Sequence, residues 1–130
     1  SYRGISKGVK MEQTTAVPAF SLAHVGINAD SAEASAAIAE QLAAVFSFPV
    51  KPGNSSNFAG VGVEVMKGAG LGKNGHIGFG TPDVEAAVRY LSDRGVAFDP
   101  ATARYKDGVL NAIYLKEEFG GFAVHLVRKG

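Results

Sequence analysis

The sequence lacks cysteine altogether, and it lacks long apolar runs. Without cysteine the chain can form no disulfide, no thiolate metal site and no cysteine nucleophile. The absence is compatible with a reducing compartment. No apolar run approaches the roughly 18 residues that a membrane-spanning helix needs, and nothing resembles a secretory signal. We therefore expect a cytoplasmic protein without a membrane partner.

A charge excess of either sign is missing as well. Thirteen basic and twelve acidic residues give a net charge of +1, so nucleic acid is not an expected partner. Hydrophobic residues make up 46% of the 130 residues and charged residues 19%, which is typical of one globular domain. We expect residues 1–18 to be an N-terminal tail or linker, because they show no sustained periodicity, and residues 19–130 to form the domain.

What the sequence does contain is a repeat built around histidine. "AHVGINADSAE" begins at Ala23 and "GKNGHIGFGTPD" begins at Gly72. Each places histidine, an apolar residue, glycine and another apolar residue before turn and capping residues and a helical pattern. His24 and His76 stand 52 positions apart, and each half of the domain occupies about 50 residues.

The pattern around each histidine predicts the same order of elements, β-α-β-β-β. In the first half Asp30 is the expected helix N-cap, with Glu33 as its capping-box partner. In the second half residues 81–83 are expected to open the helix. Two units are too few for a solenoid, so their sheets must close around a shared cavity. The prediction is an α+β domain with module one at about 19–67 and module two at about 75–129. The glycine-rich stretch between the two modules, residues 67–75, lacks the glycine spacing of a phosphate-binding loop. It is interpreted as the crossover between the modules.

Alternation along the strands places each chemically capable side chain beside small residues. His24 shares a strand face with Gly26, and His76 shares one with Gly78. In the last predicted strand of each half, Glu64 follows Gly62 and His125 follows Ala123 at the same spacing. A lone histidine in a strand is more often a core residue. Three histidines and one carboxylate at matched positions favour a cavity with a metal site, although polar residues kept only for organic ligands remain the alternative.

This arrangement resembles the vicinal oxygen chelate superfamily, which includes glyoxalase I, extradiol dioxygenases and the fosfomycin and bleomycin resistance proteins. The resemblance covers residues 20–129 and implies two βαβββ modules in a half-open curved barrel with helices outside. It also implies a divalent metal ion held by the first and last strands of each module. The implied ligands are His24, Glu64, His76 and His125. His125 stands where that superfamily most often has glutamate. Around "HVGIN", "GNSS", "GHIGFGT", "YLKEE" and "GGFAVHLV" the sequence is most similar to the domain fused to bacterial 2-keto-3-deoxy-phosphogluconate / 4-hydroxy-2-oxoglutarate aldolases.

The resemblance implies a metal-dependent lyase or isomerase acting on a small oxygen-rich acid, such as a 2-keto sugar acid or an α-hydroxycarbonyl compound. The metal would be zinc, nickel, cobalt, manganese or iron, acting as a Lewis acid. Glu64 is the expected general base. The competing interpretation is a non-catalytic module that binds a small acid or keto acid, or a binding protein of the antibiotic-resistance type. A homodimer is expected, and an aldolase is the candidate protein partner.

Overall fold

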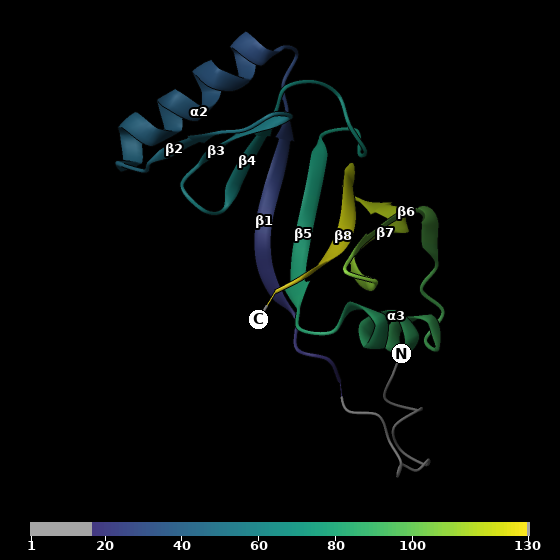
Figure 1. The fold of residues 1–130 in the computed structure, drawn as a ribbon. Helices are drawn as coiled ribbons and strands as arrows, with labels where there is room; N and C mark the ends of the chain where they lie inside the picture. Colours follow the sequence, from purple (N-terminus) through teal and green to yellow (C-terminus); the bar gives the residue numbers. More distant parts are fainter. Residues whose placement is uncertain (1–16, 130) are drawn as a thin grey trace.

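The structure, a computed structural model, describes residues 17–129 (Figure 1). Most of the predicted N-terminal tail, residues 1–16, lies outside the described residues. The first half contains β1 (Ser21–Asn28), α2 (Ala32–Phe46), β2 (Val50–Pro52), β3 (Ser56–Ala59) and β4 (Val63–Met66). The second half contains β5 (Gly75–Thr81), α3 (Val84–Ser92), β6 (Phe98–Lys106), β7 (Val109–Phe119) and β8 (Phe122–Arg128). The predicted β-α-β-β-β order, stated twice, is confirmed.

All eight strands form one curved open sheet, in the order β2-β3-β4-β1-β5-β8-β7-β6. Outward from the centre, each half places its first strand innermost, followed by its fourth, third and second strands. The first strands, β1 and β5, pair antiparallel at the middle, and each pairs on its other side with the last strand of its own half, in parallel. Figure 1 shows β1, β5 and β8 running side by side through the centre of the molecule. The four strands predicted to carry the site are therefore neighbours.

Each helix covers one half of the sheet and builds a small core there. Under α2, Ala39 packs with Ala59 and Val65, all nearly inaccessible to solvent. Under α3, Val84 packs in a cluster with Leu126 and other residues of β7 and β8. Because side chains alternate along a strand, the neighbours of Val65 and Leu126 point to the opposite face. The helices thus leave free the face that carries the predicted site.

Helix capping follows the sequence in one half and departs from it in the other. The predicted N-cap Asp30 is wrong: Ser31 caps α2, with extended backbone and its Oγ accepting a hydrogen bond from the Ala34 amide at 3.0 Å. In the second half the helix opens within the predicted residues 81–83, with Asp83 as the N-cap accepting from the Ala86 amide at 3.0 Å and Pro82 preceding the helix. Within the part of the chain that the structure describes, no helix has the length and hydropathy to cross a membrane.

Candidate metal centre

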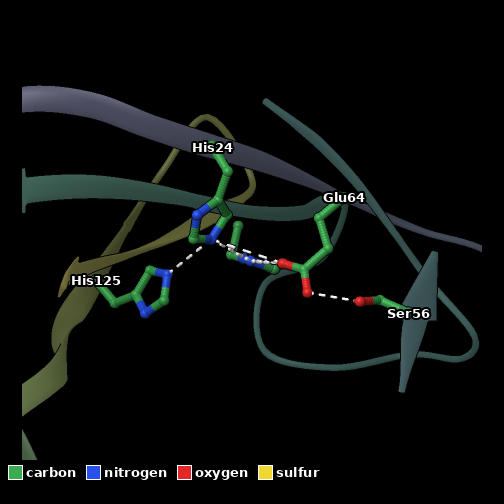
Figure 2. A network of polar contacts seen from close by, with 5 residues as sticks. His24, Ser56, Glu64 and His125 are labelled. Carbon is green, nitrogen blue, oxygen red and sulfur yellow. Dashed lines mark hydrogen bonds and ion pairs between the residues drawn. The ribbon is translucent and has the colours of Figure 1, made fainter. Parts of the chain in front are cut away.

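The four predicted residues come from four adjacent strands and converge on one point. His24 lies on β1, Glu64 on β4, His76 on β5 and His125 on β8. Figure 2 shows the side chains of His24, Glu64 and His125 gathered together. His76 Nε2 lies 3.1 Å from both His24 Nε2 and Glu64 Oε1. The structure therefore brings together every side chain that the sequence pattern predicted for the site.

Pairing between the two central strands explains why each histidine is followed by glycine two residues later. In the antiparallel register His24 lies opposite Gly78, and His76 lies opposite Gly26. A Cβ atom on Gly26 would stand 2.0 Å from His76 Cε1, and one on Gly78 would stand 2.6 Å from His24 Cε1. Each histidine of one repeat thus occupies space that the glycine of the other repeat leaves open.

The ligand atoms of the cluster lie within direct reach of one another. His24 Nε2 is 3.1 Å from His76 Nε2 and 3.2 Å from His125 Nε2. Glu64 Oε1 is 3.1 Å from His76 Nε2 and 3.6 Å from His24 Nε2. One ligand atom from each of the three histidines lies within 4.8 Å of the other two, a grouping that could hold a metal ion. Glu64 is not part of this grouping and joins it through its contacts with His24 and His76.

Hydrogen bonding alone does not account for this geometry. An imidazole nitrogen carries at most one proton, whereas His24 Nε2 has three close neighbours, namely two other Nε2 atoms and the Glu64 carboxylate. Ligands placed about 2.0–2.1 Å from a central zinc ion in tetrahedral geometry lie about 3.3–3.4 Å from one another. The distances from His24 Nε2 to its three neighbours are compatible with a divalent ion held between these side chains.

Glu64 is held at both of its oxygens. His76 Nε2 contacts Oε1, and the Ser56 hydroxyl donates to Oε2 at 2.7 Å. The hydrogen bond with His76, followed by that with Ser56, lowers the pKa of Glu64 to about 2 despite its partial burial. From the sequence, the "NSSN" stretch at residues 54–57 could present hydroxyls and amides to a ligand or could simply form a turn. Its second serine is instead the first residue of β3, and its nearly buried position beside Glu64 follows from the β3–β4 pairing.

Burial keeps His24 and His125 in the form that binds metals. It lowers the pKa of His24, and the charge of Glu64 only partly offsets this. Burial lowers the pKa of His125 to about 4, assisted by the neighbouring histidines. Neutral imidazole presents a lone pair, which a metal ligand requires. Both side chains are therefore neutral near pH 7.

Tyr114 is a neighbour of the cluster that the sequence pattern did not reveal. Its ring stacks on the His125 imidazole, with centroids 4.4 Å apart and planes at 15°. The two residues are opposite one another in the β7–β8 pairing, which includes a register shift. Burial raises the pKa of Tyr114. Its place depends on strand register, which the alternation of residues along one strand does not define.

No protein-family model matches the chain, and neither does any curated protein. Solved structures do match it. The methylmalonyl-CoA epimerase from Mycobacterium tuberculosis is 17% identical, with 90% of this chain and 92% of that chain covered and a TM-score of 0.59. A variant of the Streptomyces coelicolor methylmalonyl-CoA epimerase, in complex with 2-nitronate-propionyl-CoA, is 21% identical, with 85% and 94% covered and a TM-score of 0.58.

A hypothetical protein from Bacillus halodurans C-125 is 13% identical, with 86% of this chain and 96% of that chain covered and a TM-score of 0.59. At these identities the likeness concerns the arrangement of the backbone, which is the predicted one. The chain therefore has the α+β fold of the vicinal oxygen chelate proteins, which the epimerases share.

Proposed function

We propose that the chain belongs to the vicinal oxygen chelate superfamily and binds one divalent metal ion through His24, Glu64, His76 and His125. The observation that carries this proposal is the convergence on His24 Nε2 of two further imidazole Nε2 atoms and one carboxylate oxygen, at distances of 3.1 to 3.6 Å. Imidazole and carboxylate together suit zinc, nickel, cobalt, manganese and iron, so the ligand set supports several metals.

The activity that this site supports best is a metal-dependent isomerase or lyase reaction on a small oxygen-rich acid, such as a 2-keto sugar acid or an α-hydroxycarbonyl compound. Three neutral imidazoles and one carboxylate would leave a divalent ion with a net positive charge, which favours an anionic ligand with two neighbouring oxygens. A bound ion would supply Lewis-acid stabilisation of negative charge on such oxygens. Methylmalonyl-CoA epimerases are among the structural neighbours, and epimerases invert the configuration at a carbon.

Glu64 is the proposed general base for removing a proton from the carbon beside a carbonyl. It is the carboxylate that contacts the histidine cluster. A low pKa makes a carboxylate a weak base, so this role requires Glu64 to leave its contact with His76 when substrate binds. Ser56 then remains as the hydrogen-bond donor that orients it.

The second candidate is a non-catalytic module that binds the same class of acid. The specific observation in its favour is the double engagement of Glu64, because a carboxylate held by both His76 and Ser56 acts more readily as a structural ligand than as a base. Antibiotic binding of the resistance-protein type belongs to this second class.

Proton exchange distinguishes the two candidates. The protein is loaded with zinc or nickel and mixed with 2-keto acids in deuterated water, and the signal of the proton beside the carbonyl is followed by NMR. The proposal predicts loss of that signal above the spontaneous rate, suppressed by a chelator and in Glu64→Gln protein that still retains metal. Ligand binding without faster exchange would contradict the catalytic proposal and support the binding module.

A further inference from the structure

A hollow adjoins the candidate metal centre on the same face of the sheet. It measures about 330 Å³ and is lined by residues of the crossover between the modules and of β6, β7 and β8. Two of its lining residues are cross-strand neighbours of the histidine cluster. Ala123 pairs with His76, and Tyr114 pairs with His125. Part of a ligand bound at the histidine cluster could therefore extend into this hollow.

The lining of the hollow offers both hydrogen-bond donors and acceptors. Asp99 and Glu118 contribute carboxylates, Lys116 an ammonium group and Tyr114 a phenolic hydroxyl. Thr102 is already engaged, because its hydroxyl donates to the Asp99 carbonyl at 2.7 Å and accepts from the Tyr114 amide at 2.9 Å. Within residues 17–129, by contrast, the side chains of Lys116 and Glu118 and the Tyr114 hydroxyl form no hydrogen bond or ion pair.

The charges of these groups narrow the chemistry of an occupant. Two carboxylates against one ammonium leave the hollow with one net negative charge. A phosphate or carboxylate in it would meet like charge, which disfavours an anionic chain. An alkyl chain would cover the charged groups of Asp99 and Lys116 without replacing their hydrogen bonds to water. A hydroxyl group both donates to a carboxylate and accepts from an ammonium, so it suits each of these partners.

We propose that this hollow binds the uncharged, hydroxyl-bearing chain of an oxygen-rich acid whose reacting oxygens lie at the metal centre. The proposal rests on the proposed function, because the metal centre must hold the acid end of the ligand. Tyr114 lies at the junction between the two regions, since its ring stacks on His125 and also lines the hollow. Its hydroxyl then contacts the ligand where the acid end meets the chain.

Calorimetry on metal-loaded protein tests the proposal with three probes that share a 2-keto acid group. They are 2-ketogluconate with a hydroxyl-bearing chain, 2-oxobutanoate with an alkyl chain and 2-oxoglutarate with a carboxylate. We expect 2-ketogluconate to bind about tenfold more tightly than either of the others, as one or two added hydrogen bonds would give. Equal affinities, or a preference for 2-oxoglutarate, would overturn the proposal.

A variant of a residue that lines the hollow tests whether the preference for 2-ketogluconate arises there. The Ala101 amide donates a hydrogen bond to Asp99 Oδ1 at 3.1 Å. Asp99→Asn keeps an oxygen that can accept this hydrogen bond but removes the negative charge. We expect it to weaken 2-ketogluconate binding severalfold and to improve 2-oxoglutarate binding, with metal affinity unchanged. Asp107→Asn is the matched control, because Asp107 lies in the exposed β6–β7 turn at φ 53, a conformation that asparagine tolerates. An equal effect of both variants would contradict the assignment.

Metal binding is measured separately from the binding of the acids. A protein that binds none of the metals would overturn the proposed function, and the proposed role of the hollow with it. A protein that binds metal and all three acids without preference would overturn the role of the hollow alone.

Discussion

Among single residues, the candidate site consists of four side chains and the small residues beside them. The two repeats differ at their last ligand position, where one half has Glu64 and the other has His125. Glu64 is fixed by Ser56 and His76, whereas His125 is fixed by the stacked ring of Tyr114. A carboxylate and an imidazole thus occupy equivalent places and are oriented by different means.

Replacement of His125 tests whether it is a ligand. His125→Ala should lower metal affinity by more than the roughly 10- to 100-fold typical of losing an outer-shell partner, because one of the proposed ligands is gone. His125→Glu should retain metal, since a carboxylate also suits these ions. Calorimetric titration and thermal unfolding of both variants provide the measurement. If metal affinity is unchanged in both and alanine is the more stable replacement, His125 is a core residue instead.

The stability of the metal-free protein should depend on pH in a defined direction. The pKa of His125 is about 4 in the folded chain against an ordinary value of 6.5, so between these values the unfolded chain binds a proton that the folded chain does not. Stability should therefore be fully present above pH 6.5 and fall as the pH decreases toward 4. The lowered pKa of His24 acts in the same direction.

Denaturant unfolding across that pH range, with chelator present, checks this prediction. His125→Asn is the matched variant, because it keeps a polar side chain without the titration, and it should show a shallower pH dependence. A metal-free wild-type protein that becomes more stable as the pH falls from 6.5 to 4 would show that these histidines are not held neutral by the fold.

At the scale of elements, the pairing of β1 with β5 is what creates the site. The sequence His-x-Gly on one strand lies against Gly-x-His on the other, so that each imidazole covers a glycine. This pairing requires the antiparallel register observed here, and a one-residue shift of either strand would move the histidine of that strand to the helix-covered face. The repeated motif is therefore a structural requirement of the strand pair as well as a supply of ligands.

Glycine replacement tests that requirement. Gly26→Ala places a methyl group 2.0 Å from His76 Cε1, so the imidazole must move, and we expect a loss of stability of about 1–3 kcal/mol together with weaker metal binding. Gly62→Ala is the control, because a Cβ there meets nothing within 4 Å and the residue lies directly before β4. Equal metal affinities of the two variants would contradict the proposed role of the glycine.

Much of this arrangement could be predicted from the sequence, because it follows from the alternation of residues along each strand and from the internal repeat. Alternation along strands placed His24 with Gly26 and His76 with Gly78, and the repeat placed Glu64 and His125 at equivalent positions. Contacts that depend on pairing between strands could not be predicted in this way. Ser56 reaches Glu64 through the β3–β4 pairing, and Tyr114 reaches His125 across a β7–β8 ladder with a register shift.

At the scale of the whole molecule, the two halves have the same order of elements but unequal dimensions. The helix of the first half is 15 residues long and covers strands of three or four residues, whereas the helix of the second half has nine residues beside strands of seven to eleven. The hollow proposed to bind a ligand chain lies over the longer strands. The site is thus symmetric at its ligands and asymmetric in its surroundings.

The predicted homodimer is a property of the whole molecule that one chain does not display. Sedimentation velocity of the metal-loaded protein should give the mass of two chains, and a mass of one chain across the concentrations used for calorimetry would contradict the prediction. The aldolase partner also stays a prediction, and co-sedimentation with an aldolase of the resembled family is its direct test.

A metal titration shows whether the four side chains form a metal centre. Protein purified without chelators is first analysed for bound metal, then stripped and titrated with zinc, nickel, cobalt, manganese and ferrous iron by calorimetry. The account predicts one ion per chain for at least one of these metals, with the affinity strongly reduced in His24→Ala, whose side chain contacts the other three proposed ligands. A folded protein that contains no metal and binds none of the five would contradict it.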